Sequence, residues 1–229
     1  TKFTSKVKTP EPYTIEQMKQ LLEGVKDTQW EFIIVLGGLY GMRRNEVLGL
    51  RWSNIDEGQG CFHIMQQLAS RETKKATGET LAELKEDHSL RTLPITNEAS
   101  IYFERQKARR NTSINSDFIV CKEDGKPLSE GHISRDFNKL LKELGLPYCR
   151  FHDLRHAAAT NMHQLTGDFY TVGEILGHSL KGIGNQLGIV GGLEAITERY
   201  VDVRLERKRM VLETYHKAVQ KKAAKERER

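Results

Sequence analysis

The chain of 229 residues has little cysteine and no long apolar run, and both absences narrow what it can be. Its three cysteines, Cys61, Cys121 and Cys149, are odd in number and show no paired spacing, so a disulfide framework is not expected. No apolar stretch approaches the length that spans a membrane, and the polar, basic opening residues lack a signal-peptide pattern. Internal repeats and low-complexity segments are also missing. These features favour a cytosolic protein with reduced thiols.

Charge is plentiful in both signs, with 36 Lys and Arg against 31 Asp and Glu and a formal net charge of +5. The excess is concentrated near the end, where residues 201–229 hold ten Lys or Arg and five Asp or Glu. A solvated terminal helix explains such a run. A nucleic-acid partner is compatible with it but is not established by it.

Hydrophobic periodicity predicts a mainly α fold with one small antiparallel β-sheet, an α+β arrangement. A capping box at Thr14 and Gln17 begins the first helix, and residues 30–42 are apolar nearly all round, which indicates a buried central helix. Asn45 is expected to cap a short helix through Leu50. The remaining expected helices are 96–110, 129–144, 153–164, 171–176 and 193–200, and the expected strands are 61–69, 80–86 and 90–95, with the polar stretch 70–79 as a connection.

Four short segments concentrate side chains that could carry chemistry. Taken singly, each has an ordinary explanation: Arg43 and Glu46, three residues apart, are typical of a surface ion pair, and Lys85 is typical of a solvated strand. The segments and their ionisable or phenolic residues are 40–52 with Arg43, Arg44 and Glu46, 84–95 with Lys85 and Arg91, 151–160 with His152 and Arg155, and 176–203 with His178 and Tyr200.

Taken together, these segments resemble the tyrosine recombinases, also called the phage integrase family. The motifs are GMRRNEVLGLRW, a hairpin with Lys85 and Arg91, then HDLRH, LGHS and ERYVDV, in the order and approximate spacing of that family. The resemblance covers about Pro12 to Val203 and implies the family's catalytic-domain fold. It implies that residues 1–13 are a linker from a missing N-terminal DNA-binding domain, 14–203 the catalytic domain, and 204–229 a basic, helical C-terminal tail.

The same resemblance assigns a role to each residue of the site. Double-stranded DNA at an attachment or core site is the implied partner, bound by a tetramer with accessory DNA-bending proteins from the host or the element. The implied activity is integration or excision of a phage or conjugative transposon in the bacterial cytoplasm, without membrane, metal or cofactor. The implied roles are Arg43 as first catalytic arginine, Glu46 as its acidic support, Lys85 as hairpin lysine, His152 and Arg155 as the HxxR pair, His178 as second histidine and Tyr200 as nucleophile.

Phosphoryl-transfer chemistry supports these roles independently of the resemblance. Two arginines can hold the non-bridging oxygens of a phosphodiester in bidentate fashion as charge develops there. A tyrosine hydroxyl, with a pKa of ~10, needs a neighbouring acceptor or positive field to become a nucleophile. A lysine can protonate the departing 5′ oxygen. We therefore expect a 3′-phosphotyrosyl intermediate at Tyr200 and strand exchange through a Holliday junction.

Several alternatives remain open from the sequence. The interval of 21 residues between His178 and Tyr200 is longer than is usual in the family, so Tyr215 is a rival nucleophile, and Arg44 is a rival to Arg43. A type IB topoisomerase shares the chemistry, and a non-catalytic DNA-binding module could keep these residues. A metallohydrolase is a more distant alternative, because His152 and His156 have the spacing of two helical zinc ligands. The basic tail is expected to couple neighbouring protomers, so that deleting 209–229 would weaken assembly more than chemistry.

Overall fold

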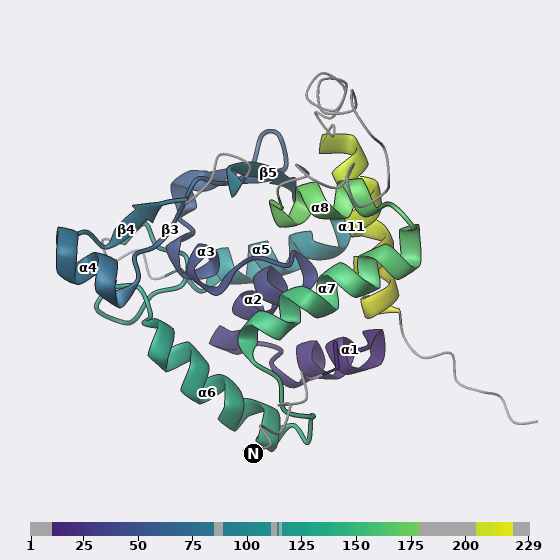
Figure 1. Ribbon diagram of the computed structural model, residues 1–229, viewed down its shortest axis with the longest axis horizontal. Helices are drawn as coiled ribbons and strands as arrows, with labels where there is room; N and C mark the ends of the chain where they lie inside the picture. Colours follow the sequence, from purple (N-terminus) through teal and green to yellow (C-terminus); the bar gives the residue numbers. More distant parts are fainter. Residues whose placement is uncertain (1–10, 85–88, 111–113, 115, 179–204, 222–229) are drawn as a thin grey trace, which may run out of the picture.

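The chain folds as a mostly helical structure with two small antiparallel sheets, as seen in the computed structural model (Figure 1). The structure describes residues 11–84, 89–110, 114, 116–178 and 205–221. The predicted α+β class is confirmed, and the helix predicted at 193–200 lies outside the described residues. None of the described helices is long and apolar enough to cross a membrane. The principal helices are α1 (Ile15–Gly24), α2 (Gln29–Ile34), α3 (Arg44–Gly49), α5 (Asn97–Ala108), α6 (Glu130–Glu143), α7 (Phe151–Thr166), α8 (Phe169–Leu176) and α11 (Leu205–Gln220).

The central apolar segment is buried as predicted, but it is not one regular helix. After α2 the backbone continues as a π-helix, η1 (Val35–Leu39), and every residue from Glu31 to Met42 is buried. Glycines let other elements approach closely here, because a Cβ on Gly37 would lie 2.6 Å from the Phe151 ring of α7. The segment ends at Gly41, whose φ of +65° lies in the left-handed region that favours glycine.

The strands differ from the prediction in number and grouping. A short strand β1 (Ile55–Asp56), which the sequence analysis did not predict, pairs with β2 (Cys61–Ile64), and β2 pairs with β5 (Arg91–Pro94). The predicted strand 61–69 is divided at the half-exposed Met65, and its second part, β3 (Gln66–Leu68), pairs separately with β4 (Leu81–Glu83). There are therefore two sheets among the described residues rather than one.

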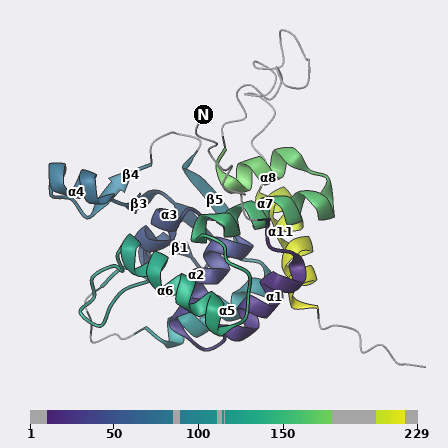
Figure 2. The ribbon, with the colours of Figure 1, turned by 60° about the horizontal axis from the view of Figure 1, so that its bottom comes forward.

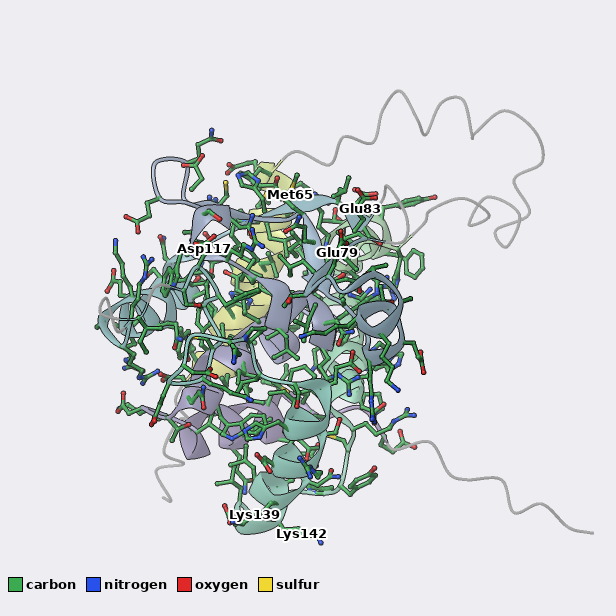
Figure 3. All side chains as sticks on the ribbon, turned by 90° about the vertical axis from the view of Figure 1, so that its left-hand side faces the viewer. Met65, Glu79, Glu83, Asp117, Lys139 and Lys142 are labelled. Carbon is green, nitrogen blue, oxygen red and sulfur yellow. The ribbon has the colours of Figure 1, made fainter. Side chains whose placement is uncertain are left out.

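The polar stretch between β3 and β4 is a helix, α4 (Arg71–Thr77), where the sequence suggested only a connection. The Ser70 hydroxyl caps its start and Gly78, in the left-handed conformation, ends it. Together, β3, α4 and β4 form one side of the molecule in Figures 1 and 2. Figure 3 views the molecule from that side, with Glu79 and Glu83 above and the exposed Lys139 and Lys142 at the lower end of α6.

Helix α11 packs into the same core as the preceding helices. It contacts α7 and α8, and the two views in Figures 1 and 2 agree on this position. The Tyr215 hydroxyl donates a hydrogen bond of 3.0 Å to the Gly38 carbonyl in η1. The part of the expected tail from Leu205 to Gln220 is thus helical and contributes core residues, namely Val211, Leu212, Tyr215 and Val219.

Candidate active site

The first part of the site is an acid placed between two arginines at the start of α3. Glu46 has no exposed side-chain surface, and its carboxylate accepts hydrogen bonds from the Arg43 backbone at 2.8 Å and from the Arg43 guanidinium at 2.8 Å. Arg91 of β5 donates to both carboxylate oxygens, at 3.2 and 2.8 Å. Burial alone would raise the pKa of Glu46, but the two arginines outweigh it and lower the pKa to about 2. Glu46 is therefore ionised and fixed.

Residue 43, not Asn45, is the cap of α3, which corrects the prediction. The Arg43 backbone N–H is satisfied by the Glu46 side chain three residues later, while the Asn45 amide donates to Glu130 of α6 at 2.7 Å. Arg44 also points to α6, where it forms a 2.6 Å ion pair with Glu130. Arg43 and Arg44 thus point in different directions, and only Arg43 shares a carboxylate with the buried cluster.

Arg155 of α7 lies close to the same cluster of Arg43, Arg91 and Glu46. Its side chain is buried, and its guanidinium donates to the carbonyls of Gly41 and Leu176, both at 2.7 Å. No carboxylate pairs with it among the described residues. Burial, with Arg43 and Arg91 nearby, lowers its pKa to about 9, so it stays charged at pH 7. A buried cation held only by carbonyl oxygens is well suited to bind an anion.

Two histidines complete the described part of the site. His178 follows Gly177, whose left-handed backbone ends α8 and whose carbonyl accepts a 3.3 Å hydrogen bond from Arg43. Partial burial and the charges of Arg155 and Arg43 lower the pKa of His178 to about 4. Partial burial and the His156 and Arg155 charges also lower the pKa of His152, in the first turn of α7. Both rings are therefore neutral at pH 7.

A surface pocket of about 460 Å³ lies at the side of this cluster. Arg43 and His152 lie on its wall, and the polar residues around them come from α3, α6 and the start of α7. The basic side chains give the pocket a positive character suited to a phosphate backbone. The residues lining it are Arg43, Arg44, Asn45, Gln67, Ser134, Asn138, Tyr148, Arg150, Phe151 and His152.

The structure thus brings together Arg43, Glu46, His152, Arg155 and His178 from segments far apart in the sequence. Lys85 and Tyr200 lie outside the described residues. The rival nucleophile Tyr215 is fully buried, and burial raises the pKa of its hydroxyl well above the ordinary value. It cannot meet a DNA phosphate without unfolding α11.

The pairing of Arg91 with Glu46 was not predicted from the sequence. In the structure, Arg91 and Leu93 are buried while Leu90 is exposed and Thr92 is half-exposed, so Arg91 lies on the inward face of β5. A charged residue at such a position requires a buried partner.

The two histidines considered as zinc ligands are His152 and His156, whose ring centroids lie 5.0 Å apart. Among the described residues, one group of three or more metal-ligating side chains comes within ligand spacing, formed by Asp56, Cys61 and His63 of β1 and β2. It includes neither His152 nor His156. The geometry of the described site therefore gives a metallohydrolase no support.

Comparison with known proteins agrees with this arrangement. The model of the phage integrase family matches residues 13–185, and the chain belongs to this family. A tyrosine recombinase XerC-like protein of Caldanaerobacter subterraneus subsp. tengcongensis is 24% identical over 185 residues, covering 74% of this chain and 47% of that protein. The XerC recombinase of Serratia marcescens is 26% identical over 179 residues, covering 74% and 52% respectively. The chain spans about half the length of these curated relatives.

Solved structures show the same fold. A Tn1549 transposon integrase in complex with a circular-intermediate DNA superposes with a TM-score of 0.68, at 20% identity, over 86% of this chain and 68% of that one. The XerA recombinase superposes with a TM-score of 0.60, at 19% identity, over 89% of this chain and 66% of that one. The predicted tyrosine recombinase catalytic-domain fold is confirmed.

Proposed function

We propose that this chain is the catalytic part of a site-specific DNA recombinase that cuts and rejoins DNA through Tyr200. The observation that carries the proposal is the cluster in which Arg43 and Arg91 bind the buried Glu46 and Arg155 lies close by, next to a surface pocket that Arg43 lines. Three guanidinium groups against one carboxylate leave an excess of positive charge where a phosphate would be bound. Its substrate would be double-stranded DNA at the attachment site of a mobile element, in the bacterial cytoplasm.

The arginines would act on the phosphate in the transition state. Arg43 is partly exposed, with 35% of its side-chain surface accessible, and it lines the pocket, so its free donors can reach a non-bridging oxygen. Arg155 lies deeper, fixed by two carbonyls. Positive charge that is already in place when negative charge develops on phosphorus oxygens stabilises the transition state without reorganisation.

The histidines would act as neutral groups. With a pKa of about 4, His178 has an N–H donor and a free ring nitrogen at pH 7, so it can donate to a phosphate oxygen or accept a proton. In the reaction, the Tyr200 oxygen forms a bond to phosphorus and loses its proton to a neutral acceptor. The bond to the 5′ oxygen breaks, and Lys85 protonates that oxygen. A second strand's 5′ hydroxyl reverses the step and returns the proton.

Assembly on DNA is a further part of the proposal. Solved relatives include XerH bound to its difH substrate and the Tn1549 integrase bound to transposon right-end DNA. By analogy, four copies of this protein would assemble on two DNA sites, aided by DNA-bending proteins.

A suicide substrate tests the nucleophile. The substrate is DNA with a nick close to the cleavage site, so that cleavage releases a short fragment that bears the 5′ hydroxyl. Once this fragment has diffused away, the reaction cannot reverse, and the chain should stay covalently bound to the 3′ phosphate. Replacing Tyr200→Phe should abolish the trapped product, because no phenolic oxygen is available to form the ester. Mass spectrometry of the digested adduct identifies the linked residue.

The matched control is Tyr170→Phe, since Tyr170 lies at the start of α8 and does not line the pocket. That variant should be trapped like the unaltered chain. Covalent attachment of the Tyr200→Phe variant, or an adduct mapped to another tyrosine, would contradict the assignment.

A further inference from the structure

Arg91 makes more contacts at the centre of the site than any role assigned so far requires. Its side chain is only 2% exposed and joins three elements. It donates to both oxygens of Glu46 in α3, from Nε to the Ile175 carbonyl at the end of α8 (2.8 Å), and from one terminal nitrogen to the Ser89 carbonyl just before β5 (2.9 Å). Each contact uses a different edge of the planar guanidinium, which a lysine could not reproduce.

Two of these contacts lead directly to residues of the reaction. Glu46 holds Arg43 by its backbone and by its guanidinium, so the carboxylate is a bridge between Arg91 and Arg43. The Ile175 carbonyl lies two residues before Gly177, whose own carbonyl is bonded to Arg43 and whose turn places His178. Fixing α8 at this point fixes both the turn and the histidine.

We infer that Arg91 is a positioning residue of the reaction, which aims Arg43 through Glu46 and holds the α8 turn that carries His178. The inference rests on the proposed function, since it concerns the same site. Arg91 itself is too deeply buried to touch the DNA. It acts by keeping a partly exposed arginine and a turn in one geometry before the phosphate arrives.

An alternative role would be purely structural, as an ion pair that stabilises the fold. The chain offers a matched control for this, because a second buried carboxylate is paired with arginines far from the pocket. Glu31 of α2 is 1% exposed and is bonded to Arg105 of α5 at 2.7 Å and to Arg109 at 3.0 Å. Removing Arg105 breaks a similar pair without touching the site.

The test compares Arg91→Met, Arg91→Lys and Arg105→Met in single-turnover cleavage of the suicide substrate at saturating DNA. A misplacement of about 1 Å in a catalytic group can lower a rate about 10²-fold. We expect a loss of that order for Arg91→Met and a smaller loss, about tenfold, for Arg91→Lys, with less than threefold change in DNA affinity. Arg105→Met should cleave like the unaltered chain once folded.

A second measurement separates this inference from the proposed function. In the unaltered chain the Arg43 guanidinium is bonded to Glu46 and to the Gly177 carbonyl. Its Nε–H order parameter by NMR should therefore fall in Arg91→Lys, whether or not the protein cleaves DNA. Failure of the unaltered chain to form a Tyr200 adduct would refute the proposed function alone.

A double variant gives the decisive comparison. If Arg91 acts in part through Arg43, then adding Arg91→Lys to Arg43→Lys should lower the rate by a smaller factor than Arg91→Lys does in the unaltered chain. Fully multiplicative losses, an unchanged Arg43 order parameter, or a folded Arg91→Lys that cleaves at the unaltered rate would each overturn the inference. If both Arg91 variants fail to fold, the residue is structural and the inference is overturned as well.

Discussion

At the scale of single residues, protonation is set by burial, and His216 is the clearest example outside the site. Its ring is fully buried between Thr96, whose hydroxyl lies 2.8 Å from Nδ1, and the Leu39 carbonyl, 3.2 Å from Nε2. Because a carbonyl oxygen only accepts, Nε2 is the donor, and in the neutral ring Nδ1 accepts from the Thr96 hydroxyl. Burial lowers the pKa of His216 to about 4.

This pKa predicts an acid-sensitive stability. Between the unfolded pKa of ~6.5 and the folded value, the unfolded chain binds a proton at this ring and the folded chain does not, so stability falls as pH falls. From pH 7 to pH 5 the contribution of His216 is about 2 kcal/mol, at ~1.36 kcal/mol per pH unit below 6.5. The free energy of unfolding, measured with urea at pH 7 and at pH 5, should fall by about 2 kcal/mol more in the unaltered chain than in the His216→Gln variant. Equal losses would contradict the prediction.

The site residues show which roles a sequence can reveal. Arg43, His152, Arg155 and His178 lie in motifs with fixed local spacing, and their convergence could be predicted from a family resemblance. The role of Arg91 could not, because it depends on which three elements meet around β5 in space.

At the scale of elements, the backbones of α3 and β3 approach each other closely at Gly49. Gly49 of α3 has no room for a side chain: a Cβ would lie 2.7 Å from the Leu68 backbone nitrogen and 2.8 Å from the Gln67 carbonyl carbon. Because the obstructing atoms are backbone, they cannot move aside by a rotamer change. The glycine therefore lets the start of the β3–β4 sheet pack on the helix that begins with the Arg43 cap.

Replacing Gly49→Ala should destabilise the protein by about 1–3 kcal/mol, as overpacking does, although alanine is the better helix former. Gly131→Ala in α6 is the control, since a Cβ there meets nothing within 4 Å. That variant should gain about 0.5–1 kcal/mol. Denaturant unfolding of both variants measures the difference, and a stabilised Gly49→Ala would show that β3 can shift away freely.

Helices were easier to predict than strands for a physical reason. The boundaries of α5 and α6 were found within about two residues, because Thr96 and Ser129 cap them with side-chain hydrogen bonds encoded locally. The sheets depend on pairing between distant segments. Nothing local in residues 61–69 shows that Met65 ends one sheet and begins another.

At the scale of the whole molecule, helix α11 is part of the hydrophobic core. The sequence suggested a basic tail that couples protomers. That coupling stays a prediction. The structure adds a role in the core for the described part of the tail: Leu212 and Tyr215 are fully buried beneath α7 and η1, and Arg209 donates to the Ile95 carbonyl at the end of β5. Helix α11 therefore carries basic residues and also completes the core on which the site is built.

We therefore predict that a chain ending at Arg204 loses cooperative urea unfolding and cleavage together, instead of losing assembly alone. Leu212→Ala should cost about 2–5 kcal/mol, the range for large-to-small changes in a core. The control is a chain ending at Lys221, which keeps all of α11 and should unfold and cleave like the complete chain. The prediction is contradicted if a chain ending at Arg204 folds and still cleaves a single DNA site. The four core side chains of α11, Val211, Leu212, Tyr215 and Val219, would then not be needed for folding. Contacts between protomers should therefore be tested in chains that keep α11, by replacing residues on its exposed surface. Met210, which is 55% accessible, is one such residue.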